Sequence, residues 1–257
     1  MFPISDENAE PGLPVVTIGL IALCVAVFLW QITLSDAEAE HAARLYGMVP
    51  ANVFGLAIGG QTAAIPAWAT IFTSMFMHGG LAHIGGNMLY LWIFGDNVEH
   101  AMGRARFLLF YLLAGTIAAL AQALQVPSSD VPMIGASGAI SGVLGAYLLL
   151  HPFARIRVLI MPLPFFIRVV NIPAVAVLGF WFLIQFLSGL ASPADQGGVA
   201  FWAHIGGFVA GVVLVPFFKR RGVSLLQQER SRVFDARRED ERSHDRQGGW
   251  RRGPWDR

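Results

Sequence analysis

The sequence predicts an all-α membrane protein, a bundle of six membrane-spanning helices with both ends of the chain in the cytoplasm. Three observations lead to this fold class. The 257 residues are 55% hydrophobic and only 14% charged, which is too apolar for an ordinary soluble domain. Apolar runs of membrane-spanning length recur along the chain. The basic residues are confined almost entirely to one set of the segments between these runs.

Five apolar runs have roughly the 20 residues that a helix needs to cross the hydrocarbon core, and one further run is shorter. No basic segment precedes the first run, so we interpret it as a span and not as a signal peptide. We expect the spans at 13–34, 78–98, 105–124, 137–151, 169–190 and 200–218.

The distribution of lysine and arginine predicts the orientation of the bundle. With both termini in the cytoplasm, 17 of the 18 basic residues lie on the cytoplasmic side, which is the bias that the positive-inside rule describes. Arg44 is the exception, and it falls in a long first external loop, 35–77. We expect a cytoplasmic segment at 1–12, the six-span core at 13–218 and a charged, flexible cytoplasmic tail at 219–257.

Strongly polar side chains stand near one end of three spans, where burial in lipid is costly and points to function. His83 and Asn87 in span two are four residues apart, so they share one helix face. Ser137 begins span four, and His204 lies about one turn inside span six. Spans two, four and six all run from the outside inward, which predicts one common depth for these side chains.

Small residues predict how spans four and six pack against each other. Two G-x-x-x-G pairs allow the helices a close approach, and the glycine face of span six also carries His204. If the two glycine faces meet, the imidazole of His204 can reach the hydroxyl of Ser137, which is the minimum arrangement for activating a serine. The pairs are Gly138 with Gly142 and Gly207 with Gly211.

Acyl transfer also needs N–H donors for the developing oxyanion. We expect His83, Asn87 and the backbone N–H of Ser137, at a helix N-terminus, to supply them. No carboxylate accompanies these residues in the outer leaflet, so we expect a Ser–His dyad and not a triad, and no metal site. Cys24 is the only cysteine, which excludes an intramolecular disulfide.

Four motifs in this order resemble the rhomboid intramembrane serine proteases, over roughly residues 13–218. The resemblance implies an endopeptidase that cleaves transmembrane segments of other proteins. By position, it implies Ser137 as nucleophile, His204 as general base and acid, and His83 and Asn87 in the oxyanion hole. The motifs are HGGLAHIGGN in span two, GDNVEHAMG after it, GASG in span four and AHIGGFVAG in span six.

The same resemblance implies the surroundings of the site. His78, Gly135 and Gly138 would have supporting roles, and residues 179–186 of span five would form a lateral gate. Within that run, Trp181 is expected to anchor the helix at the interface or face lipid. The family implies transmembrane protein substrates in a lipid bilayer, no cofactor and no nucleic-acid partner. The six-span form suggests a bacterial inner membrane, with the site opening to the periplasm.

Two positions depart from the family pattern. Ala69 stands in the first loop where many rhomboids have an arginine. Ser141 stands four residues after Ser137, where bacterial members often have an aromatic ring that stacks on the base. Other contacts must therefore hold His204, and the Ser141 hydroxyl is one candidate.

Two other classes of function compete with proteolysis. A non-catalytic scaffold of the same fold would bind client helices without cutting them, but such a protein is expected to lack the serine or the base. A transporter or haem-binding bundle would also use intramembrane histidines. It predicts histidines paired at ligand distance, whereas the expected partner of His204 is the hydroxyl of Ser137.

Overall fold

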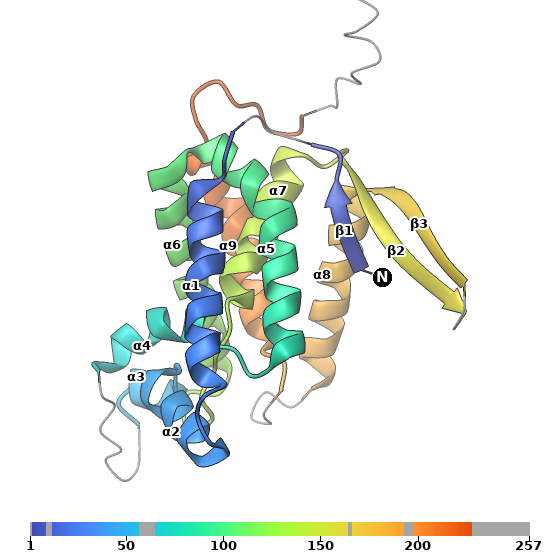
Figure 1. The fold of residues 1–257 in the computed structure, drawn as a ribbon. Coiled ribbons are helices and arrows are strands. Elements are labelled where there is room, and N and C mark those ends of the chain that lie inside the picture. Colours follow the sequence, from blue (N-terminus) through green and yellow to red (C-terminus); the bar gives the residue numbers. More distant parts are fainter. Residues whose placement is uncertain (1, 9–11, 57–64, 164–165, 193–197, 228–257) are drawn as a thin grey trace, which may run out of the picture. The chain divides into compact units, whose positions relative to one another are not determined.

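Six long helices pack side by side in the part of the chain that the computed structural model describes, residues 2–8, 12–56, 65–163, 166–192 and 198–227 (Figure 1). The helix α7 lies inside this bundle, and nearly all of its side chains are buried. The six are α1 (Val15–Gln31), α5 (Leu81–Met102), α6 (Arg104–Gln125), α7 (Ser137–Leu150), α8 (Ala174–Ala191) and α9 (Phe201–Phe218).

The apolar composition of these helices suits a bilayer to different degrees. Among the described residues, α6, α8 and α9 are long and apolar enough to cross a membrane, with mean hydropathies of 2.0, 2.0 and 1.8. The helices α1 and α7 are apolar but shorter, while α5 is long but carries Asp96 and Glu99. Each predicted span therefore contains one helix. By length and apolar composition alone, three of these helices are candidate membrane spans.

The expectation of an all-α fold is wrong at one place, where a three-stranded antiparallel sheet forms in the order β1-β2-β3. It lies beside α5 and α8 in Figure 1. Strand β3 takes up the first residues of the predicted fifth span, so α8 begins only at Ala174. The strands are β1 (Phe2–Asp6), β2 (Arg155–Leu163) and β3 (Phe166–Pro173).

The sequence of β2 does carry a strand signal. Ile156 and Val158 are buried, whereas Arg155 and Arg157, which alternate with them, are exposed. This alternation has the period of two that a half-buried strand requires. Its partner β3 contains the run Val169-Val170, and β-branched residues favour strands.

The predicted external loop at 35–77 is largely helical where the structure describes it. Helix α2 begins with a capping box, in which the Ser35 hydroxyl accepts from the Glu38 backbone N–H and a Glu38 carboxylate oxygen accepts from the Ser35 N–H. Met48 forms a β-bridge with Met133, which ties the loop to the segment before α7. The elements are α2 (Asp36–Tyr46), α3 (Pro50–Val53), α4 (Ala67–Thr73) and the 3-10 helix η1 (Ser74–Phe76).

The compact unit that contains the bundle continues beyond residue 218, the predicted end of the core, to Gln227. The backbone N–H groups of Leu226 and Gln227 donate to the carbonyl oxygens of Leu149 and Leu150, at 2.8 and 2.9 Å. The last carbonyls of a helix lack partners within it, so this segment satisfies the C-terminal end of α7. The remainder of the predicted tail, 228–257, lies outside the described residues.

Glu99, near the end of α5, holds the start of α1. Its carboxylate accepts hydrogen bonds from the Val16 N–H at 3.1 Å, the Thr17 N–H at 2.8 Å and the Thr17 hydroxyl at 2.9 Å. The first N–H groups of a helix have no partner within it, and the helix dipole favours a negative charge there. The run GDNVEHAMG thus has a structural role in joining α5 to α1.

The substitution Glu99→Ala should destabilise the protein, because it leaves buried donors of α1 without an acceptor. We expect the free energy of unfolding in detergent to fall by about 2–3 kcal/mol. The matched control is Glu40→Ala, which removes an exposed ion pair with Arg44 and should cost less than about 1 kcal/mol. Equal stability of the two variants would contradict the role of Glu99.

Asp6, at the end of β1, is a partly buried carboxyl group that receives hydrogen bonds from the Tyr147 hydroxyl at 2.7 Å and the Asn97 side-chain N–H at 2.9 Å. The pKa of Asp6 is raised from 3.8 to about 6, chiefly by desolvation and also by the Asp96 carboxylate, against the smaller opposing effect of the two hydrogen bonds. When β1 is paired with β2 and Asp6 is bound by Tyr147, the Asp6 carboxyl group keeps its proton up to about pH 6. When β1 detaches from the bundle, the same group releases that proton at its ordinary, lower pKa.

Docking of β1 should consequently be favoured as the pH falls from above 6 towards 4, and should be insensitive to pH well above 6. Hydrogen exchange of the β1 amides, corrected for intrinsic rates, should show more protection at pH 5 than at pH 7.5. Asp6→Asn should abolish this difference, whereas Asp130→Asn, in an exposed loop, should leave it. Equal protection of the wild-type strand at both pH values would refute the account.

Candidate active site

The helices α7 and α9 meet through their glycines. A Cβ on Gly207 would overlap the carbonyl oxygen of Gly138, and a Cβ on Gly211 would overlap that of Gly142. On the other side of α7, a Cβ on Gly138 would come within 2.7 Å of the Ala118 methyl group on α6. Backbone therefore lies directly on backbone at this crossing, which is the close approach that the paired glycines predict.

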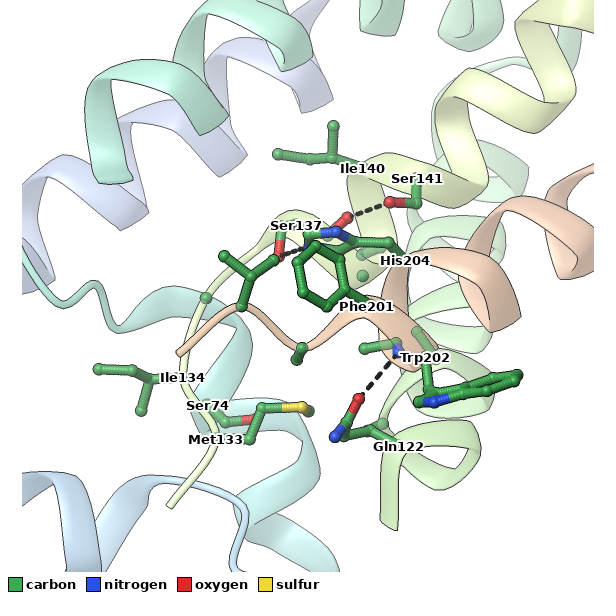
Figure 2. Close-up of a pocket in the computed structure, with 18 of the residues that line it drawn as sticks. Ser74, Gln122, Met133, Ile134, Ser137, Ile140, Ser141, Phe201, Trp202 and His204 are labelled. Atoms are coloured by element: carbon green, nitrogen blue, oxygen red, sulfur yellow. Dashed lines mark hydrogen bonds between the residues drawn. The ribbon is translucent and has the colours of Figure 1, made fainter. Parts of the chain in front are cut away.

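This crossing brings together two side chains that are 67 positions apart in the chain. The Nε2 atom of His204 lies 2.8 Å from the Oγ atom of Ser137, and Figure 2 shows the two side chains joined by this hydrogen bond. Ser137 is the first residue of α7 and His204 lies in the first turn of α9. Their contact is a hydrogen bond of ordinary length.

The opposite side of the imidazole is held by α8. The Nδ1 atom of His204 lies 2.7 Å from Oε1 of Gln185, and the Trp181 ring packs on the imidazole with centroids 5.9 Å apart. Trp181 is half-buried with its ring against the imidazole, a contact that the sequence did not predict, and its expected role as an interfacial or lipid-facing anchor stays a prediction. The sequence analysis missed Gln185, although a lone amide in the apolar run GFWFLIQF was a visible signal.

Ser141 does not take the place expected for it beside the base. Its hydroxyl donates to the backbone carbonyl oxygen of Ser137, at 2.7 Å (Figure 2). This is the bond from a serine to the carbonyl four residues earlier that is common in helices. Ser141 thus braces the first turn of α7, and the contacts to His204 come from α8 instead.

The orientation of His83 follows from its hydrogen bond. Its Nδ1 atom accepts from the Gly79 backbone N–H at 3.2 Å, so in the neutral ring the proton is on Nε2. A Cβ on Gly135 would stand 2.8 Å from Nε2 of His83 and 3.8 Å from Oγ of Ser137. Gly135 has φ +130°, which favours glycine. Its lack of a side chain leaves the His83 N–H donor next to Ser137.

Asn87 adds a second donor on the same face of α5. Its side chain is only 7% exposed, and its Nδ2 atom has no hydrogen-bond partner among the described residues. A buried amide N–H without a partner is costly, and such orphaned groups need an explanation. The explanation that fits this site is an acceptor atom that arrives with a ligand.

His78 lies behind His83, with the two rings edge to face and their centroids 5.2 Å apart. Gln31 of α1 holds its backbone through hydrogen bonds to both the N–H and the carbonyl, at 2.9 and 3.2 Å. Both ring nitrogens of His78 are buried without a partner in the described part of the chain. The structure thus places His78 next to His83, one of the predicted oxyanion donors.

His83, Asn87, Ser137 and His204 line a cavity of about 690 Å³, a size typical of small-molecule sites. Helices α6 and α7 contribute small residues to its wall. Among the described residues, no group of three His, Cys, Asp or Glu side chains is placed to hold a metal ion. The wall residues include Gly115, Ala118, Ala119, Gly138 and Ala139, and the polar residues include His83, Asn87, Ser137 and His204.

Chemically, the site contains the Ser137 hydroxyl, which is hydrogen-bonded to a potential base, His204. The N–H donors of His83 and Asn87 line the same cavity as that hydroxyl. The backbone N–H groups of the first three residues of α7, which begins at Ser137, have no acceptor within the helix. A hydroxyl, a histidine and preorganised N–H donors around one point are the parts that acyl transfer requires.

Comparison with known proteins agrees with this chemistry. The sequence matches the profile of the Rhomboid domain over residues 66–221, more than half of the chain. The chain belongs to the rhomboid family. The match includes Ser137, His204, His83 and Asn87, and it confirms the resemblance seen in the motifs.

Several rhomboids are similar to this one in sequence. Rhomboid protease GluP of Bacillus subtilis is 34% identical over 148 residues, which cover 56% of this chain and 25% of GluP. Rhomboid protein 1, mitochondrial, of Saccharomyces cerevisiae is 31% identical over 63% of this chain and 44% of its own length. Rhomboid protease AarA of Providencia stuartii is 27% identical, over 82% of this chain and 74% of AarA. The alignments thus span less than half of the first two relatives.

The crossing of α7 and α9 yields a direct test with two glycines. Gly207→Ala should lower the free energy of unfolding by about 1–3 kcal/mol, because its methyl group meets a backbone oxygen that no rotamer change can move away. Gly19→Ala in α1, where nothing lies within 4 Å of the added Cβ, should be neutral or slightly stabilising. Thermal unfolding in detergent measures both, and a Gly207→Ala protein as stable as the control would contradict the packing.

Proposed function

We propose that this rhomboid is an intramembrane serine endopeptidase that cleaves transmembrane segments of other membrane proteins. The observation that carries the proposal is the 2.8 Å contact between Nε2 of His204 and Oγ of Ser137 at the wall of a cavity. Family membership and relatives named as rhomboid proteases support the same reaction. The scaffold alternative lacks support of this kind, since both the serine and the histidine are present and in contact.

In the first half of the reaction, Ser137 Oγ attacks the carbonyl carbon of the scissile peptide bond while Nε2 of His204 takes the hydroxyl proton. The carbonyl oxygen becomes an oxyanion. When the tetrahedral intermediate collapses, the C–N bond breaks and His204 gives its proton to the leaving amine. Water then attacks the acyl-enzyme with His204 again as base, which releases the acid product and restores Ser137.

The donors around Ser137 suit the charge that develops in this step. Asn87 Nδ2–H, His83 Nε2–H and the N–H groups at the start of α7 would stabilise the oxyanion. The unpaired Nδ2 of Asn87 supports this role, since this buried donor has no acceptor among the described residues and can donate to the oxygen of a bound substrate. The unpaired ring nitrogens of His78 support a secondary role in holding a water molecule near the site.

For the substrate, we propose a transmembrane helix that unwinds locally near its outer end. A helix shields its carbonyl groups by hydrogen bonding, so the scissile bond must leave the helix before Ser137 can attack it. Substrates with glycine, alanine or proline near this point unwind at lower cost. The small residues on the cavity wall, such as Gly115 and Ala119, fit an extended backbone with small side chains.

For the membrane topology, we propose six spans with both termini in the cytoplasm and the site opening to the periplasm of a bacterial inner membrane. The loop charges support this orientation, with 17 of 18 basic residues on the cytoplasmic side. In this topology α8, which contains residues 179–186, lies at the edge where a substrate helix would enter.

Cleavage of a model transmembrane substrate in liposomes tests the proposal. Wild type should cut, whereas Ser137→Ala and His204→Ala should show no detectable cleavage. Asn87→Ala should lower kcat by about 10²–10³-fold, because it removes one oxyanion donor. The matched control is Ser224→Ala, in an exposed segment, which should cut like wild type. A folded wild type that cuts none of several substrates would overturn the proposal in favour of a binding scaffold.

A further inference from the structure

The base of the proposed dyad has a second hydrogen bond that its sequence motif does not include. Nε2 of His204 faces Ser137 at 2.8 Å, and Nδ1 faces Oε1 of Gln185 at 2.7 Å. A neutral imidazole carries its single proton on one nitrogen only. The amide oxygen of Gln185 can only accept, so this contact places the proton on Nδ1 and leaves a lone pair on Nε2.

We propose that Gln185 is a positioning residue that fixes the tautomer and ring orientation of His204 in which Nε2 can accept the Ser137 proton. This inference rests on the proposed function and assigns to α8 a part in the reaction. In serine hydrolases with a triad, a carboxylate performs this task. Here a neutral amide performs it, and within the described residues the hydrogen-bond partners of His204 are Gln185 and Ser137, neither of which is a carboxylate.

Gln185 lies in an apolar helix, where its amide needs a hydrogen-bond partner, and His204 is that partner. Gln185 stands in α8, a helix of mean hydropathy 2.0, where an amide is costly unless it is hydrogen-bonded. Trp181 precedes it by four residues, so both side chains lie on one face of the helix. That face meets the imidazole, with the amide at its edge and the indole packed on the ring.

Helix α8, which carries Gln185, has few buried residues of its own. Only Ala174, Leu178 and Gly189 of α8 are buried, whereas α7 is buried along almost its whole length. His204 is therefore oriented by a helix with little core contact of its own. If α8 moves away from α9, the acceptor on Nδ1 and the packing of Trp181 are lost together, so the base is oriented only while α8 is in place.

Steady-state cleavage of the model substrate tests the role of Gln185. Gln185→Leu keeps similar size but removes the acceptor, so kcat should fall by about 10- to 100-fold with KM within about twofold. Gln185→Glu restores an acceptor, so it should recover most of kcat. Its carboxylate also stabilises the imidazolium, which should move the acidic limb of the pH–rate profile to higher pH. The control Gln125→Leu, at an exposed end of α6, should match wild type.

A spectroscopic readout separates this proposal from the proposed function. In protein labelled with ¹⁵N-histidine, the resonances absent from His204→Ala identify His204. They should report a proton on Nδ1 in wild type and a mixture of tautomers in Gln185→Leu. An inert wild type with the Nδ1 proton would overturn the protease but support the positioning role. A wild type that cuts, with Gln185→Leu equal to it in kcat and tautomer, would overturn the role of Gln185 alone.

Discussion

The separation of two helix backbones, α7 and α9, is the constraint on which the site depends. The hydrogen bond between Ser137 and His204 forms because glycines allow one backbone to rest on the other. Any side chain at Gly207 would meet the Gly138 carbonyl oxygen and push the helices apart. Hydrogen-bond strength falls steeply with distance and misalignment, so even a small separation would leave the hydroxyl without its base.

The polar groups within this apolar bundle fall into two kinds. Some are satisfied within the protein, as in the chain of contacts from Ser137 through His204 to Gln185, or in the Glu99 carboxylate at the start of α1. Others have unused donors, of which Asn87 is the clearest. Satisfied groups stabilise the fold, whereas unused donors beside a cavity are prepared to bind an acceptor. This difference separates the architecture of the bundle from the chemistry proposed for it.

Much of the helical layout could be predicted because composition and hydropathy determine which segments enter a bilayer. The approach of His204 to Ser137 could also be predicted, since helical periodicity places His204 on the same face as Gly207 and Gly211. Gln185 could not be assigned in this way. Its amide stands out in an apolar run, but the sequence does not indicate that this face of α8 meets His204 on α9.

The sheet was missed for a different physical reason. Strand β1 pairs with β2, about 150 positions away, and nothing in the five residues of β1 indicates so distant a partner. The alternation in β2 was visible, but its arginines were interpreted only as markers of a cytoplasmic loop. The helix contacts in contrast recur with a fixed period within short segments, which a sequence reveals directly.

The most direct test of the central claim is the reaction of the purified protein with a serine-directed fluorophosphonate, followed by mass spectrometry of its peptides. The account predicts one adduct, on Ser137, and a rate of labelling that falls to background in His204→Ala. That result would mean that the contact with His204 activates this hydroxyl. Labelling of Ser137 at the same rate in both proteins, or of a different serine in the wild type, would contradict the claim.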